Sequence, residues 1–322
     1  MISKEDLRIV FMGTPDFAVE SLKILVENGF NIVGVITAPD KPAGRGQKLR
    51  KSPVKVYAES QGLKVLQPTN LKDPGFLDEL RELKADLQVI VAFRMLPEVV
   101  WNMPPLGTFN LHASLLPQYR GAAPINWAVI NGEKETGVTT FFLRHEIDTG
   151  NIILQEKIEI GPDDNAGVVH DKLMETGAKL VLKTVEQIVA GEVKTTPQEK
   201  LAEGEVLKPA PKIFKNDCKI DWRESAQAIH NKIRGLSPYP AAWSEFQLKD
   251  GKKISFKIFE AELSDCEASA PGTVKSDGRS FIEIAASDGC VRINRIQLAG
   301  KKQLAVQDFL RGFDIGVVEK AV

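Results

Sequence analysis

The sequence predicts an α/β protein of two domains, a Rossmann-like parallel sheet covered by helices followed by a small OB-like β-barrel. The first observation is the order strand, helix, strand over residues 8–37, which is the opening of a βαβ unit. The second is a change after residue 208 to short strands separated by Gly or Asp turns. The third is the length of 322 residues, which suits two domains. We therefore expect a first domain over 1–190, a polar linker over 191–208 and a barrel over 209–322.

Hydrophobic periodicity predicts the elements of the first domain in turn. Strand 8–12 leads through Thr14, a helix N-cap type, and Pro15, a first-turn type, into a helix that ends at Gly29. Strand 87–93 is apolar throughout, so we expect it in the centre of the sheet with both faces covered. The other expected strands are 31–37, 63–66, 109–113, 137–143 and 151–160, and the other helices are 53–59, 76–83, 97–101, 124–130 and 165–189.

The second domain is expected to be a β-rich module with one helix near its start, over 226–234. Its Lys and Arg residues are scattered, which fits either a solvated surface or one face of a binding track. The expected strands are 243–248, 253–259, 272–274, 281–285 and 291–298.

Composition excludes several classes of protein. No apolar run approaches the roughly 18 residues of a membrane span, and the first residues carry charge without an apolar run, so neither a span nor a signal peptide is expected. Cys218, Cys266 and Cys290 are widely spaced and include no Cys-x-x-Cys pair, so we expect neither a disulfide framework nor a zinc site. These features fit a reducing cytoplasm.

A polar site is predicted where strand 109–113 ends. Asn110 and His112 are two residues apart, so on a strand their side chains project to the same face. Open α/β sheets bind ligands at the carboxyl ends of their strands. A carboxamide and an imidazole placed together could donate hydrogen bonds to the oxyanion of a tetrahedral intermediate. Asp148 also follows a strand, and the fold could bring it beside His112 to orient the ring.

Less specific interpretations of the same residues stay open. A buried Asn and His can simply satisfy backbone groups of a turn, and an Asp before Gly is common in turns. There is no Gly-x-Gly-x-x-Gly after the first strand, which makes a nicotinamide enzyme a weak alternative, and no phosphate-binding Walker A sequence.

A basic segment over 40–55 contains six Lys or Arg residues and one acid. A long loop of this kind inside an α/β domain is uncommon and often functional. The segment includes Arg45, Lys48, Arg50 and Lys51, which suit contacts with the phosphates of a nucleic acid. A solvated, flexible loop is the other explanation.

The string Asn-x-His-x-Ser-Leu-Leu-Pro over 110–117, continued to Pro124, resembles the signature of the folate-dependent formyltransferase family. The basic segment and the second domain are similar to the branch that acts on methionyl-tRNA. The resemblance covers nearly the whole chain, and its other motifs lie at 11–18, 42–46, 52–55, 148–150, 233–243 and 297–302.

The resemblance implies that the chain is an enzyme that moves a formyl group from 10-formyltetrahydrofolate to the α-amine of methionyl initiator tRNA. Asn110 and His112 would bind the oxyanion, and Asp148 would hold His112 and assist proton removal from the amine. Ser114, Leu115, Leu116 and Pro117 match the folate-binding segment, and Arg45 matches an arginine that engages the tRNA acceptor end. No metal is expected, and the family suggests a monomer.

Two departures from the family pattern affect the site. Phe93-Arg94 replaces a common Tyr-Gly pair, and Glu146-Ile147 replaces a Gly-Leu pair, which adds a carboxylate near Asp148. A formyltransferase that acts on an amino sugar nucleotide or another small amine is the nearest rival, because it shares the signature without needing the basic segment. An RNA-binding protein that has lost catalysis is a further rival.

Overall fold

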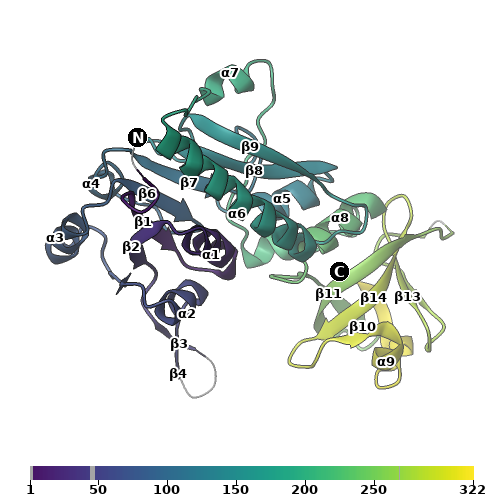
Figure 1. The fold of residues 1–322 in the computed structure, drawn as a ribbon. Helices are drawn as coiled ribbons and strands as arrows, with labels where there is room; N and C mark the ends of the chain where they lie inside the picture. The colour runs from purple at the N-terminus through teal and green to yellow at the C-terminus, as the bar shows by residue number, and fades with distance from the viewer. Residues whose placement is uncertain (1–2, 44–47, 268) are drawn as a thin grey trace. The chain divides into compact units, whose positions relative to one another are not determined.

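The structure, a computed structural model, describes residues 3–43, 48–267 and 269–322. The described residues form two compact units, each containing a sheet of seven strands (Figure 1). Both units draw on separated parts of the chain, so the middle of the sequence is divided between them. The first unit comprises Met1–Gly121, Thr136–Ile158 and His170–Pro209, and the second comprises Ala122–Glu135, Glu159–Val169 and Ala210–Val322.

A largely parallel sheet organises the first unit, as predicted. In spatial order its strands are β5 (Val65–Leu66), β2 (Asn31–Ile36), β1 (Arg8–Gly13), β6 (Leu87–Val91), β7 (Thr108–His112), β8 (Glu135–Phe142) and β9 (Ile152–Glu159). The pairs from β5 to β7 are parallel, whereas β8 runs antiparallel to β7 with Phe142 opposite Phe109. The carboxyl ends of β1, β6 and β7 therefore lie on one edge of the sheet.

Two helices of the first unit, α2 (Pro53–Ser60) and α3 (Pro74–Glu82), begin at residues whose side chains cap the helix. Ser52 and Asp73 each accept the backbone N–H of the residue three positions on. The helix after β1 differs from the prediction, because Asp16–Ala18 forms a 3-10 turn after Pro15 and the α-helix starts only at Val19. Among the described residues, no helix is long and apolar enough to cross a membrane. The helices are α1 (Val19–Glu27), α2 (Pro53–Ser60), α3 (Pro74–Glu82), α4 (Glu98–Trp101), α6 (Ala166–Ala190, whose first turn belongs to the second unit) and α7 (Gln198–Ala202).

One core of the first unit lies between the central strands and the helices α3 and α4. Val10 and Met12 of β1 and Ile90 of β6 are buried there, in one cluster with Leu80 of α3 and Val100 of α4. This packing holds β1 and β6 rigidly next to β7. It therefore fixes the strand ends from which the candidate site is built.

The second unit is a nearly closed antiparallel barrel. In spatial order its strands are β12 (Val274–Ser276), β13 (Ile282–Ala285), β14 (Cys290–Leu298), β11 (Lys253–Ser264), β10 (Ala242–Leu248) and β16 (Val318–Ala321), with β15 (Leu304–Ala305) beside β14. Gly272, two residues before β12, links the β12–β13 end of the sheet to β16 at the other end. Its N–H donates to Ala285 at 2.8 Å, and its carbonyl accepts from Ala321 at 2.8 Å. Gly272 has a φ of +88°, and a Cβ there would lie 2.3 Å from the carbonyl oxygen of Ala321, so only glycine fits.

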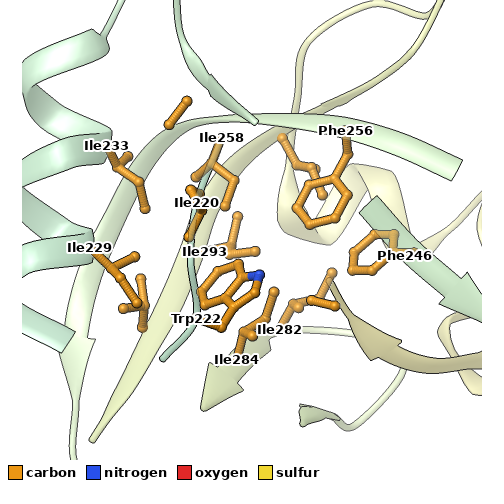
Figure 2. Packing of buried hydrophobic residues seen from close by; sticks show 14 of the residues in the cluster. Ile220, Trp222, Ile229, Ile233, Phe246, Phe256, Ile258, Ile282, Ile284 and Ile293 are labelled. Atoms are coloured by element: carbon orange, nitrogen blue, oxygen red, sulfur yellow. The ribbon is translucent and has the colours of Figure 1, made fainter. Parts of the chain in front are cut away.

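The barrel interior is filled by aromatic and branched aliphatic side chains (Figure 2). Phe246 and Phe256 stack at 3.9 Å between ring centroids, and the indole N–H of Trp222 donates to Ser244 at 2.9 Å. Ile229 belongs to the same buried cluster. It lies on α8 (Ala226–Leu236), and the remaining helices of this unit are α5 (Pro124–Ile130) and α9 (Val306–Leu310).

Cys266 and Cys290 form a disulfide, which corrects the expectation that the cysteines stay unpaired. The physical reason is the strand order. β11 pairs with β14 rather than with β12, its neighbour in sequence, and the register places Ser264 opposite Cys290. The two cysteine Cα atoms then lie 5.8 Å apart, although their sequence separation is 24 residues. Cys218 is buried and has a free thiol.

We predict that Cys266→Ser lowers the free energy of unfolding of the oxidised protein by about 3 kcal/mol, because a cross-link over 24 residues restricts the unfolded chain. Urea unfolding without reductant measures the difference. Adding reductant should cause the same loss in the parent protein and none in the variant. Equal stability of the oxidised and reduced parent protein would contradict the prediction.

Candidate active site

Strand β7 carries the two central residues of the candidate site. Phe109 and Leu111 are 0% and 3% exposed and form part of the core. Between and after them, Asn110 is partly exposed and His112 is 7% exposed. Because β7 pairs with β6 on one side and β8 on the other, its backbone cannot shift without breaking two ladders. Asn110 and His112 are therefore held at the carboxyl end of a strand inside the sheet.

The His112 ring is oriented by a backbone carbonyl. Its Nε2 lies 2.8 Å from the carbonyl oxygen of Tyr119. A carbonyl oxygen can only accept, so Nε2 carries a hydrogen and Nδ1 is the nitrogen left for chemistry. Nδ1 lies 4.0 Å from Oδ2 of Asp148, which is ion-pair distance but too long for a hydrogen bond. The resemblance implies that Asp148 holds His112, and in the structure the ring donates its hydrogen bond to the carbonyl of Tyr119 instead.

Asp148 itself is held in an irregular loop between β8 and β9. Its side chain is 13% exposed, and its Oδ2 accepts the N–H of Gly121 at 3.1 Å. Its φ is +54°, a conformation that non-glycine residues adopt only with support from their surroundings. Glu146, the extra carboxylate of this loop, is exposed. The loop therefore turns Asp148 toward His112 and leaves the Glu146 side chain on the surface.

The segment Ser114 to Pro117 is mostly interior. The Ser114 hydroxyl donates to the carbonyl of Gln118 at 2.7 Å, and its own carbonyl accepts from Thr139 at 2.6 Å. Leu116 and Pro117 are buried and joined by a cis peptide bond, whereas Leu115 is partly exposed. The Ser114 side chain thus holds a turn of the chain.

A cleft of about 1100 Å³ opens beyond β6, the strand next to β7. The departure at Phe93-Arg94 falls here. The Arg94 guanidinium donates to the carbonyl of Thr69 at 2.8 Å and to that of Pro68, and it lies over the Phe93 ring. Arg94 thereby ties two loops of the cleft wall together. The lining residues are Thr69, Asn70, Leu71, Lys72, Arg94, Met95, Leu96, Pro97, Glu98, Val99 and Asn102.

Part of the basic segment is a two-stranded hairpin, β3 (Lys41–Ala43) and β4 (Lys48–Arg50), where the sequence predicted an irregular loop. Strands of three residues are too short to show periodicity. Arg45 lies outside the described residues, and so does the Lys48 side chain. Arg50 is exposed, and the exposed Lys51 pairs with Glu59 at 2.6 Å.

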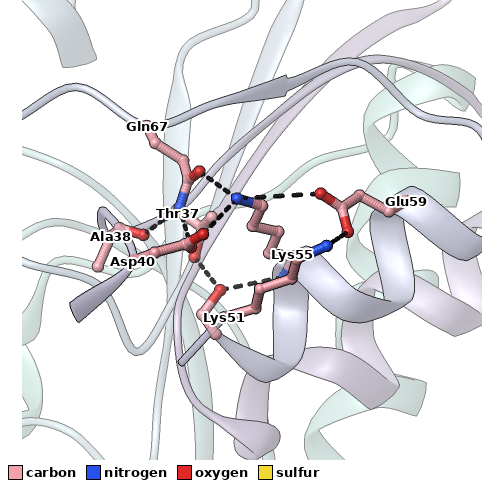
Figure 3. Close-up of polar contacts among 8 residues, drawn as sticks. Thr37, Ala38, Asp40, Lys51, Lys55, Glu59 and Gln67 are labelled. Atoms are coloured by element: carbon pink, nitrogen blue, oxygen red, sulfur yellow. Dashed lines mark hydrogen bonds and ion pairs between the residues drawn. The ribbon is translucent and has the colours of Figure 1, made fainter. Parts of the chain in front are cut away.

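The base of this hairpin is anchored by Lys55 (Figure 3). Its Nζ lies 2.7 Å from Oδ2 of Asp40 and 2.6 Å from Oε1 of Gln67. The Nε2 of Gln67 donates to the other carboxylate oxygen, Oδ1 of Asp40, at 2.8 Å. The hydrogen bonds that Asp40 accepts from Lys55 and Gln67 lower its pKa, with Lys55 the larger cause and Gln67 the second. A carboxyl with a lowered pKa contributes stability above its ordinary titration range and loses it as the pH falls through the lowered value. The anchor is therefore intact throughout the neutral range.

Sequence analysis missed three contributors to the site. Tyr119 and Arg120 lie within the signature string, but no pattern in the sequence marked them individually as site residues. Gln198 is 0% exposed and contacts the Asp148 loop, yet it lies in the segment assigned as a polar linker. Within the described residues, no group of three or more His, Cys, Asp or Glu side chains could hold a metal ion.

Two family models match the chain, "Formyl transferase" over residues 7–185 and "Formyl transferase, C-terminal domain" over 212–314. The chain is 60% identical to methionyl-tRNA formyltransferase of Bacteroides fragilis over 315 residues, 98% of this chain and 97% of that protein. It is 61% identical to the protein of the same name from Bacteroides thetaiotaomicron over 313 residues, 97% of each chain.

Solved structures show the same fold at lower identity. HypX from Aquifex aeolicus in complex with tetrahydrofolic acid has a TM-score of 0.64 and 21% identity, and the match covers 96% of this chain and 48% of that one. An N-formyltransferase from Helicobacter canadensis, in complex with folinic acid and dTDP-3-aminofucose, has a TM-score of 0.64 and 24% identity, with 94% and 100% covered.

Proposed function

This chain belongs to the formyl transferase family, and on that premise we propose that it transfers the formyl group of 10-formyltetrahydrofolate to the α-amino group of methionyl initiator tRNA, giving N-formylmethionyl-tRNA for translation initiation. The observation that carries the proposal is 60% identity over 98% of the chain to a protein named methionyl-tRNA formyltransferase. The small-amine reading is weaker, because the sugar formyltransferase structures are 24% identical or less.

In the proposed reaction, the neutral methionyl amine attacks the formyl carbon and places negative charge on its oxygen. The Asn110 carboxamide donates a hydrogen bond to that oxyanion. His112 donates a second one from Nδ1 when the ring is protonated, because Nε2 is already committed to Tyr119. The Asp148 carboxylate, 4.0 Å away, stabilises the imidazolium and helps remove the proton from the attacking amine. The bond from the formyl carbon to the folate nitrogen then breaks, and that nitrogen takes up a proton.

The folate-derived donor is assigned to the edge of the sheet next to His112. The cleft of about 1100 Å³ lies beyond β6, the strand next to β7, and its lining does not include Asn110, His112 or Asp148. The segment Ser114 to Pro117 follows β7 directly. Its turn shapes the place where the formyl group is transferred. Leu115 is the partly exposed side chain of that segment. We assign no metal to the reaction, since the formyl donor is already activated.

The tRNA is assigned to the basic hairpin, through Arg45, Lys48, Arg50 and Lys51, together with the second domain. The Lys55 anchor supports this assignment for Lys48 and Arg50, because it holds the base of the hairpin whose strand β4 contains them. We propose residues 1–190 as the catalytic domain, 191–208 as the connection and 209–322 as the tRNA-binding domain. We further propose that the enzyme acts as a monomer in the cytoplasm.

The direct test mixes the purified protein with 10-formyltetrahydrofolate and charged methionyl initiator tRNA, and measures N-formylmethionyl-tRNA. Elongator methionyl-tRNA and free methionine are the control substrates. Product from the initiator tRNA alone is the expected result. Absence of product while the folate still binds would overturn the tRNA assignment and favour a small amine as acceptor.

A further inference from the structure

We infer that Gln198 is a positioning residue that sets the place of Asp148 opposite His112. The inference rests on the proposed function, in which the Asp148 carboxylate acts on the imidazolium and on the attacking amine. Gln198 itself does not face the reacting atoms. Its side chain lies behind the loop that carries Asp148, and it is 0% exposed.

The Gln198 carboxamide uses its full hydrogen-bonding capacity. Its Nε2 donates to the carbonyl of Asp148 at 2.8 Å and to the carbonyl of Gly150 at 2.8 Å. Its Oε1 accepts from Nε of Arg120 at 3.0 Å and from Nη2 of the same guanidinium at 2.6 Å. A buried carboxamide that donates two hydrogen bonds and accepts two is held in a single orientation.

These four bonds join the two segments that define the distance between His112 and Asp148. On one side, Arg120 stands between Tyr119, whose carbonyl holds the His112 ring, and Gly121, whose N–H holds the Asp148 carboxylate. On the other side lies the irregular loop of Asp148. Gln198 therefore ties the support of the imidazole to the support of the carboxylate.

The Asp148 loop needs such a tie. Asp148 has a φ of +54°, a conformation that a non-glycine residue keeps only with support from its surroundings. Gly150 packs so closely that a Cβ would lie 1.5 Å from the carbonyl oxygen of Phe142. The loop is thus fixed at Gly150 by close packing and at Asp148 by the Gln198 carboxamide.

Gln198 is itself held to the sheet. Thr196 and Ile152 exchange two backbone hydrogen bonds of 2.8 Å, so the chain just before α7 is paired with β9. This explains how a residue from a stretch that the sequence assigned to a linker can act as a fixed point. The carboxamide reaches the site from a rigid element.

The test compares Gln198→Leu and Gln198→Glu with Glu199→Gln. Leucine removes all four bonds, whereas glutamate keeps acceptors for Arg120 and loses both donors to the loop. Glu199 is a matched control, because it is the next residue of the same helix, its side chain is 64% exposed, and its contact with the loop is a surface ion pair with Arg144 at 3.2 Å, a kind of pair that contributes little. We expect both Gln198 variants to lower the single-turnover rate about 10²-fold with the KM for 10-formyltetrahydrofolate unchanged, and Glu199→Gln to match the parent.

A double-mutant cycle separates positioning from general damage. In an Asp148→Asn background, the Gln198 variants should cause little further loss of rate, because the group they position is already gone. A full additional loss in that background would overturn the inference, as would parent-like rates in Gln198→Glu.

A measurement without substrate keeps this inference distinct from the proposed function. The chain has four histidines, so the His112 ring signals can be assigned in an NMR spectrum by comparison with His112→Ala. Those signals should move in both Gln198 variants and stay unchanged in Glu199→Gln. Unchanged signals in properly folded Gln198 variants would overturn the inference whatever substrate the enzyme takes.

Discussion

Replacing His112 with alanine is expected to lower kcat about 10²–10⁴-fold, the range for a group that takes part in proton transfer and charge stabilisation. The ring is 7% exposed and is hydrogen-bonded to the Tyr119 carbonyl, so alanine removes a group that the fold holds in one place. Formylation of methionyl initiator tRNA under saturating conditions measures the loss. The KM for either substrate should change little, because the interaction is strongest in the transition state.

Two further variants make this result specific. Asn110→Ala removes the other oxyanion donor and should cost about 10²–10³-fold in kcat. His170→Ala is the control, because that histidine lies on α6, away from β7 in the sequence, and pairs with Asp171 at 3.0 Å. Loss of activity in the control as large as in His112→Ala would show that the assay reports folding rather than chemistry. A biological role that is unaffected by Asn110→Ala and His112→Ala would favour an RNA-binding protein that has lost catalysis.

Reversing the charge of Arg45 and Lys48 to glutamate should abolish detectable formylation of tRNA while folate binding stays intact. Each basic side chain that contacts a phosphate releases counterions, so replacing two of them with acids weakens binding by roughly 10²-fold or more in kcat/KM for tRNA. The dependence of that parameter on salt concentration should become shallower. Binding of 10-formyltetrahydrofolate by calorimetry checks that the site itself is unaffected.

The matched control carries the same change of charge elsewhere on the surface. Lys23 is partly exposed, Lys64 is exposed, and both lie in ion pairs outside residues 40–55, so their reversal to glutamate tests the effect of net charge. An equal loss in this control would assign the effect to overall repulsion of the tRNA. Formylation that survives the hairpin reversal would mean that the tRNA is held elsewhere.

Much of the fold could be predicted from local sequence. Period-two and helical patterns located the strands and helices, and the helix expected over 53–59 is α2, Pro53–Ser60. The polar pair on β7 could be predicted for the same reason, since alternation on a strand is a local property. Features that depend on contacts between residues far apart in the sequence could not be predicted.

Three features illustrate that limit. The disulfide depends on β11 pairing with β14, which no local pattern specifies. The hairpin β3–β4 is too short to produce a period. Gln198 stands in a polar stretch without periodicity, and its importance follows only from the two carbonyls and the guanidinium that the fold brings to it.

The closure of the barrel through Gly272 and Ala321 has a consequence for how the protein is made. The first unit is complete once Pro209 has been synthesised, whereas the barrel needs Val318–Ala321 before its outer strands can join. Because domains tend to fold as units while the chain emerges from the ribosome, the first unit can fold well before the second. A nascent chain halted before β16 would hold every residue of the candidate site yet expose the apolar barrel interior. Quality-control proteases should therefore remove such unfinished chains.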